Sequence, residues 1–319
     1  MAAPSRPRLG SLQFYPRKRA EKAIPSVNWE TLKGKIADPS LLGFLTYKVG
    51  MATVMVKDNT PDSMTKGKKM ILPVTILEAP NMKVFSIRFR KNKLVVKEVV
   101  VSQDKELKKI VKVPKTLKAL DSQIPKDYDD ITILAYSLVS QTAFRKTPDM
   151  IELGLSGDLA KKLELAKSLV GKEISIKDFI VKKELLDSRA LTKAKGFSGT
   201  LQRFGLHLKQ HKSEKGRRRP GSLGPWHPAH IIFRVPMAGQ LGMFSRVVYN
   251  NKVIFTSSIK EKDINPKQGF KHFGNIKSNY IMLKGSVQGP AKRQVLLTSS
   301  FRPTKGQLKK KFDFIEVLQ

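Results

Sequence analysis

Apolar and polar residues alternate with a period of two along much of this chain. Between Met82 and Arg90, for example, Phe85, Ile87 and Phe89 alternate with serine and arginine. A two-residue period among Val, Ile and Phe is typical of a half-buried β-strand. The pattern predicts strands at residues 41–47, 52–57, 70–77, 82–90, 94–101, 131–140, 246–255, 279–285, 294–300 and 312–318. The chain is therefore predicted to be mainly β.

Helical spacing is confined to the middle of the chain. A helix is predicted over residues 157–170, where apolar residues recur on one face and Gly171 follows as a fitting end. A shorter helix is predicted after Ser102, and Pro114 would end it. Together with neighbouring strands, these helices predict a mixed α/β unit.

Two stretches lack any core-forming pattern. Residues 1–28 are basic and rich in proline, which favours an extended arm because too few apolar residues offset the cost of ordering. From Arg189 to Ser222, Glu214 is the only acid among many lysines and arginines. A long loop of this kind in a compact protein is usually functional or disordered.

These patterns predict a β core assembled from both ends of the sequence and interrupted twice. The predicted boundaries are 1–40 for a basic N-terminal arm, 41–94 for the first part of the β core, 95–185 for an α/β insertion, 186–195 for a further core strand, 196–245 for a basic excursion, and 246–319 for the second part of the core and the C-terminus.

The charge of the chain indicates the kind of partner. Lysine and arginine number 61 against 26 aspartates and glutamates, so the formal net charge is +35. Such an excess favours a polyanionic partner, either nucleic acid or an anionic membrane. The longest apolar runs are too short or too interrupted to span a bilayer, and the N-terminus shows no signal peptide. Cysteine is absent, which excludes disulfides and thiolate metal sites. Nucleic acid is the predicted partner.

Candidate catalytic groups are few. The pairs His207/His211 and His227/His230 have spacings that suit a metal, but their Lys- and Arg-rich surroundings disfavour a dication. The acidic cluster of residues 127–130 is interpreted as a solvated loop rather than an acid/base pair. No phosphate-binding loop or nucleophile motif is present. No enzyme activity, catalytic residue, metal or cofactor is predicted.

The basic excursion has the residues of a binding site. Arg217–Arg219 lie between Gly216 and Gly221, where backbone can approach a phosphate closely. Trp226 lies in a Gly- and Pro-bounded turn and is placed to stack on an unpaired base. The alternative is that aromatic residues anchor the loop on its own core. We favour base stacking for Trp226, but core anchoring for Phe233 in a predicted strand.

Sequence motifs resemble a known family over nearly the whole chain. GRRRPGSLGPWHPAHIIFRVPMAGQLGMFSR (216–246) resembles the central extension of the universal large-subunit ribosomal protein L-three family. LLGFLTYKVGMATVMVKDN (41–59) is similar to the first hairpin of that family, and SRPRLGSLQFYPRKRA (5–20) is similar to its archaeal and eukaryotic arm. The stretch DYDDITILAYSLVSQT (127–142) favours the archaeal form. The chain departs from the family at Met243-Phe244, where Tyr-His is usual.

The resemblance implies a specific architecture and role. The fold would be a translation-factor-type barrel of six strands with an α/β insertion, an extended N-terminal arm and a long non-globular finger, which is the excursion of residues 196–245. The finger, with Trp226 at its tip, would thread through ribosomal RNA towards the peptidyl transferase centre and influence the accommodation of aminoacyl-tRNA. The protein would bind near the RNA's 3′ end, assist early subunit assembly and contact neighbouring large-subunit proteins, in the cytoplasm.

The basic pattern and the resemblance together predict RNA-binding residues. These are Arg6, Arg8, Arg17, Lys18, Arg19, Arg203, His207, His211, Lys212, Lys215, Arg217, Arg218, Arg219, Ser222, Trp226, His227, His230, Gln240 and Arg246. Two other functions stay open at this point: an RNA-processing or RNA-modifying enzyme that uses the barrel as a platform, and a sequence-indifferent DNA compactor. Neither a membrane nor a small-molecule substrate is expected.

Overall fold

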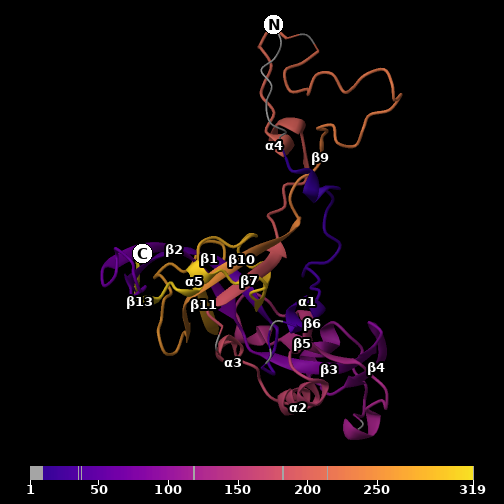
Figure 1. Ribbon diagram of the computed structural model, residues 1–319, viewed down its shortest axis with the longest axis vertical. Coiled ribbons are helices and arrows are strands. Elements are labelled where there is room, and N and C mark those ends of the chain that lie inside the picture. Colours follow the sequence, from indigo (N-terminus) through magenta and orange to yellow (C-terminus); the bar gives the residue numbers. More distant parts are fainter. Residues whose placement is uncertain are drawn as a thin grey trace. The chain divides into compact units, whose positions relative to one another are not determined.

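The protein divides into two compact units in the computed structural model, which describes residues 10–34, 36, 38–117, 119–181, 183–213 and 215–318 (Figure 1). The larger unit comprises residues 23–190 and 246–319. The smaller unit comprises residues 1–22 and 191–245. As predicted, the protein is mainly β.

The larger unit contains a sheet of seven strands among the described residues, in the order β12-β7-β10-β11-β2-β1-β13. An additional pairing between β12 and β1 closes six of these strands into a ring, and β13 lies outside it. The bounds are β1 Gly43–Asp58, β2 Lys69–Ala79, β7 Leu185–Leu191, β10 Ser245–Ser258, β11 Asn279–Lys284, β12 Gln294–Ser299 and β13 Phe312–Leu318. Both ends of the sequence thus contribute strands to one sheet.

The strand β1 closes the ring because it is long enough to change partners. Residues Gly43–Tyr47 pair with β12, whereas Thr53–Asp58 pair with β13. A register shift between Lys48 and Gly50 separates the two halves. The prediction of a hairpin within residues 41–59 was therefore wrong. The glycine marks a bulge, which interrupts the pairing pattern without reversing the chain.

A second sheet of four strands has the order β4-β3-β5-β6. Its strands are β3 Met82–Lys91, β4 Leu94–Val100, β5 Asp130–Ser137 and β6 Met150–Gly154, and the helices α2 Leu159–Leu169 and α3 Ile176–Ile180 follow them. Residues 82–94 were assigned to the first part of the core, but β3 pairs with β4 and β5. Alternation marks a strand without indicating the sheet to which it belongs.

Short elements complete the chain. They are η1 Leu12–Phe14, α1 Glu30–Lys33, η2 Lys105–Lys109, η3 Asp121–Gln123, η4 Val139–Gln141, β8 Phe197–Ser198, α4 Thr200–Phe204, β9 Gly239–Gln240 and α5 Lys305–Leu308. The helix predicted after Ser102 is only the 3-10 turn η2. One hydrophobic cluster joins the two sheets of the larger unit, since Tyr47 and Leu77 pack in it with Ile87 and Ile133.

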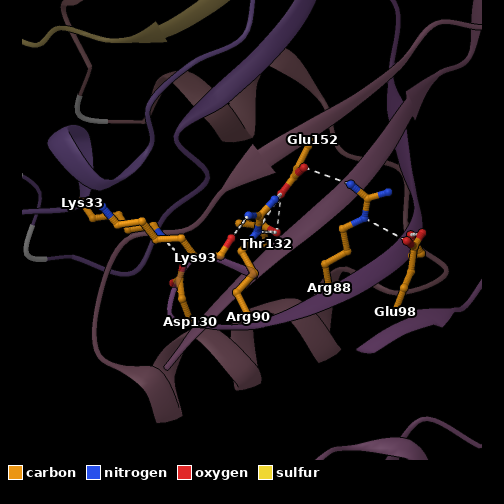
Figure 2. A network of polar contacts seen from close by, with 9 residues as sticks. Lys33, Arg88, Arg90, Lys93, Glu98, Asp130, Thr132 and Glu152 are labelled. Carbon is orange, nitrogen blue, oxygen red and sulfur yellow. Dashed lines mark hydrogen bonds and ion pairs between the residues drawn. The ribbon is translucent and has the colours of Figure 1, made fainter. Parts of the chain in front are cut away.

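One face of the four-stranded sheet carries a network of ion pairs (Figure 2). Glu152 accepts from Arg88 at 3.0 Å, from Arg90 at 2.5 Å and from Thr132 at 2.7 Å. Arg88 also pairs with Glu98 at 2.9 Å. Burial alone would raise the pKa of Glu152, but the hydrogen bonds from Thr132 and Arg90 and the two positive charges outweigh it and lower the pKa.

The acidic cluster of residues 127–130 is predicted to be a solvated loop, but only part of it is exposed. Asp130 lies at the start of β5 and forms ion pairs with Lys33 and with Lys162, the latter at 3.0 Å. Lys162 is 8% exposed, because it bends from α2 towards this carboxylate. Asp127 pairs with Lys91 at the surface. Asp130 therefore connects α1 and α2 to the sheet, whereas Asp127 stays at the surface.

Candidate nucleic-acid interface

The finger begins and ends at a short ladder in the smaller unit. Strands β8 and β9 pair antiparallel, with Phe197 opposite Gln240 and Ser198 opposite Gly239. Helix α4 follows β8 directly and ends at Gly205, whose φ of +65° is the left-handed conformation that glycine adopts readily at a helix end. The residues between α4 and β9 thus leave and re-enter the unit at neighbouring positions.

Arg203 on α4 connects three segments of this unit. Its Nε donates to the carbonyl of Gln240 at 3.0 Å, Nη1 to Met237 at 2.9 Å and Nη2 to Arg17 at 3.2 Å. A Cβ at Gly239 would lie 3.0 Å from Nη1, so a glycine there leaves room for the guanidinium. Burial lowers the pKa of Arg203, and the charge of Arg17 adds to that shift.

Arg17 holds the N-terminal arm on the same helix. Its Nη1 donates to the carbonyl of Arg203 at 2.9 Å, and its guanidinium lies 4.4 Å from the centroid of the Phe204 ring. A Cβ at Gly10 would lie 2.0 Å from the Arg17 guanidinium. Gly10 has a φ of +80°, so this position combines close approach with left-handed backbone.

The return of the chain after the finger is equally close-packed. Gly242 has a φ of +78°, and a Cβ there would lie 2.0 Å from the carbonyl oxygen of Lys193. Leu241 donates its N–H to Gly196 at 2.9 Å, and Ala20 of the arm donates to Met243 at 2.9 Å. Arm and finger base are thus joined by main-chain hydrogen bonds within one unit.

Beyond this base, the finger has few internal contacts among its described residues. Lys209 donates its N–H to the carbonyl of Arg217 at 3.2 Å, and Thr200 donates its hydroxyl to the carbonyl of Arg218 at 3.0 Å. These bonds hold the backbone while the side chains point outward. The Nε of Arg217 also donates to the carbonyl of Lys209 at 3.3 Å. All three arginines of residues 217–219 are exposed, so their guanidinium groups can reach a ligand.

Most predicted RNA-binding residues are exposed. The exposed ones are Lys18, Arg19, His207, His211, Lys212, Lys215, Arg217, Arg218, Arg219, Ser222, Trp226, His227 and His230. Arg17, Arg203 and Gln240 are half-buried in the smaller unit, and Arg246 is half-buried in the larger one. Arg6 and Arg8 lie outside the described residues. Sequence reasoning missed that Arg17 and Arg203 bind backbone carbonyls, which no charge pattern indicates.

For the aromatic residues Trp226 and Phe233, the structure departs from the prediction at Phe233. Trp226 is 87% exposed, so it does not anchor the finger on a core. Phe233 is 70% exposed and lies outside any strand, so its predicted role as a core anchor in a strand was wrong. Its ring instead meets the edge of Tyr15, with centroids 5.4 Å apart.

The described residues contain no group of three or more His, Asp or Glu side chains that could hold a metal ion. No helix in the described part of the chain is long and apolar enough to cross a bilayer.

Comparison with known proteins identifies the family. The profile of the family Ribosomal protein L3 matches residues 1–112 and 88–316. This chain belongs to the ribosomal protein L3 family. The family is one of structural ribosomal proteins.

Archaeal proteins are among the relatives of this member of the ribosomal protein L3 family. The large ribosomal subunit protein uL3 of Methanocaldococcus jannaschii is 36% identical over 327 residues, which cover 96% of this chain and 94% of the relative. The uL3 of Methanococcus vannielii is 36% identical over 313 residues (94% and 92%). The uL3 of Pyrobaculum calidifontis is 36% identical over 324 residues (94% and 93%).

Proposed function

We propose that this chain is a structural constituent of the large ribosomal subunit and that its finger binds ribosomal RNA. The observation that carries the proposal is the exposure of Arg217, Arg218, Arg219 and Trp226, together with the hydrogen bonds that hold the backbone carbonyls of Arg217 and Arg218. A net charge of +35 destabilises an isolated compact chain, and neutralisation by phosphates relieves that repulsion.

The finger has the composition needed to recognise RNA by shape. Side chains cannot read the deep, narrow major groove of an RNA helix, so recognition uses phosphates, 2′-hydroxyls and unstacked bases. The arginines of residues 217–219 supply the phosphate contacts, and Trp226 stacks on an unpaired base. In this proposal the finger extends towards the peptidyl transferase centre, and the RNA performs the catalysis.

The proposal includes two finer roles. The protein binds early, near the 3′ end of the ribosomal RNA, and it influences the accommodation of aminoacyl-tRNA through the tip at Trp226. The match to a family of structural proteins does not favour the alternative of an RNA-processing enzyme.

Sedimentation tests the proposed function. The protein is expected to sediment with the large subunit and to stay bound through a moderate salt wash. A variant that lacks only residues 206–230 is expected to fold but to give subunits that mature slowly. Recovery of the intact protein mainly as free chain would contradict the proposal.

A further inference from the structure

An exposed tyrosine lies on β10 in the larger unit. Tyr249 is 55% exposed. The next residue, Asn250, has a φ of +58°, a left-handed conformation that asparagine tolerates better than most residues. Asn251 and Lys252 are both buried, so the alternation of the strand is broken here. The left-handed backbone of Asn250 accompanies this break, and Tyr249 faces solvent.

Asn250 connects this part of β10 to the loop that follows β12. Its N–H donates to Asp187 Oδ1 at 2.8 Å, and its Nδ2 donates to the carbonyl of Arg302 at 2.9 Å. Its Oδ1 accepts from Ser300 at 2.5 Å. Asp187 is fully buried, and its Oδ2 accepts from the N–H of Phe301 at 2.9 Å. These hydrogen bonds hold the backbone of Arg302 beside Asn250, the residue that follows Tyr249.

The surroundings of Tyr249 are cationic. Arg302 is exposed, and its guanidinium lies 5.2 Å from the centroid of the Phe301 ring. Arg189 lies on the adjacent strand β7, where its Nε donates to Thr298 at 3.3 Å. The carboxylate of Asp187 is buried beneath these groups and is occupied by backbone N–H groups. The surface therefore offers an aromatic ring and positive charge without an exposed acid among these residues.

The exposed ring and the neighbouring arginines indicate the class of ligand. Tyr249 is 55% exposed and interacts electrostatically with Arg189. An exposed aromatic ring near arginines matches an unpaired nucleotide, because every base has a face that stacks and every linkage carries a phosphate.

We propose that Tyr249, Arg302 and Arg189 form a second RNA site, in which Tyr249 stacks on one unpaired base and the arginines bind the flanking phosphates. The site rests on the proposed function, since it requires an RNA partner. It belongs to the larger unit and uses no residue of the finger.

Binding of a single-stranded 12-nucleotide uridine RNA tests the site in the full chain. The measurements are made in the wild-type background and in a full chain carrying Arg217→Gln, Arg218→Gln and Arg219→Gln, which lowers the contribution of the finger. Tyr249→Leu is expected to weaken binding about fivefold or more, with an unchanged salt slope. Tyr249→Phe, the matched control, retains the affinity. Arg302→Gln is expected to reduce the slope of log affinity against log salt by about 0.7.

The outcomes separate this site from the finger. Full RNA affinity of Tyr249→Leu, with thermal midpoints matching the wild type, would overturn the second site and leave the proposed function intact. The second site would also be overturned if Tyr249→Leu lost affinity for a 12-residue polyglutamate peptide but not for the RNA. The surface would then bind an acidic protein segment. Failure of the wild-type chain to bind RNA at all would overturn the proposed function as well.

Discussion

Arg17 and Arg203 each donate a hydrogen bond to the backbone carbonyl of the other, although the two residues are 186 positions apart in the sequence. This reciprocal pair brings two cations together, which is unfavourable by itself. The arrangement is stabilised because both guanidinium groups donate to carbonyl oxygens and lie over the Phe204 ring. The pair therefore positions the finger base and the arm, instead of leaving both side chains for phosphate.

Replacement of Arg203 should loosen the base of the finger. Arg203→Lys keeps the charge but cannot reach the carbonyls of Arg17, Met237 and Gln240 together, and each lost bond to a charged group costs about 1.5–3 kcal/mol. Hydrogen exchange of the amides in β8 and β9 is expected to accelerate by at least about tenfold. Arg219→Gln, on the exposed finger, is the control and should leave these amides unchanged. Unaltered exchange in Arg203→Lys would contradict the positioning role.

Truncation of Trp226 should separate function from folding. Because the side chain is 87% exposed, Trp226→Ala is expected to change the free energy of unfolding by less than about 0.5 kcal/mol. Subunits that contain the variant should show altered peptidyl transfer. Chemical denaturation of the free protein checks the first expectation. A loss of several kcal/mol would mean that the ring packs into a core.

The ion-pair network around Glu152 should make stability depend on pH. The pKa of Glu152 is lowered in the folded state, so its ionised form is the one that folding favours. Its contribution is complete above the pKa of the unfolded carboxyl and is lost as the pH falls through the lowered pKa of the folded one. Glu152→Gln should therefore destabilise by roughly 2 kcal/mol at pH 7 and much less at pH 3. Urea denaturation at both pH values measures this difference; an equal cost at both would refute it.

Lys183 should also make stability rise with pH, but in the alkaline range. Its Nζ donates to the carbonyl of Leu41 at 2.7 Å and lies 4.0 Å from the centroid of the Phe179 ring. Burial lowers the pKa of Lys183 to about 8. The folded state thus binds fewer protons than the unfolded state between that value and the ordinary lysine pKa, and stability should rise with pH in this range. Thermal unfolding of the wild type and of Lys183→Met from pH 7 to 10 should show the rise only in the wild type.

Local patterns predicted most strands but not their partners. Alternation of apolar residues located β4 and β11 to within a residue or two, because a half-buried strand needs that period. It could not show that β1 is one bent strand, since residues on both sides of a bulge remain extended. Nor could it assign β3 to the second sheet, because pairing depends on contacts distant in sequence.

The exposed basic and aromatic residues of the candidate site were predictable from the sequence. Arg217–Arg219 and Trp226 are exposed as their acid-poor, Gly- and Pro-rich surroundings indicate. The role of Arg203 was harder to predict, because its partners are backbone carbonyls and side-chain composition does not indicate them. The glycines at positions 239 and 242 could have indicated a closely packed finger base, since both permit a close approach there. Tyr249 was missed because its exposure depends on the left-handed backbone of Asn250.

Arginine reactivity inside the native subunit tests the central claim most directly. Purified large subunits and the free protein would be treated with an arginine-specific dicarbonyl reagent, and the modified residues would be identified by mass spectrometry. The account predicts that Arg217, Arg218 and Arg219 react in the free protein and are protected in the subunit. Equal reactivity of these three arginines in both states would contradict the proposal that the finger binds ribosomal RNA.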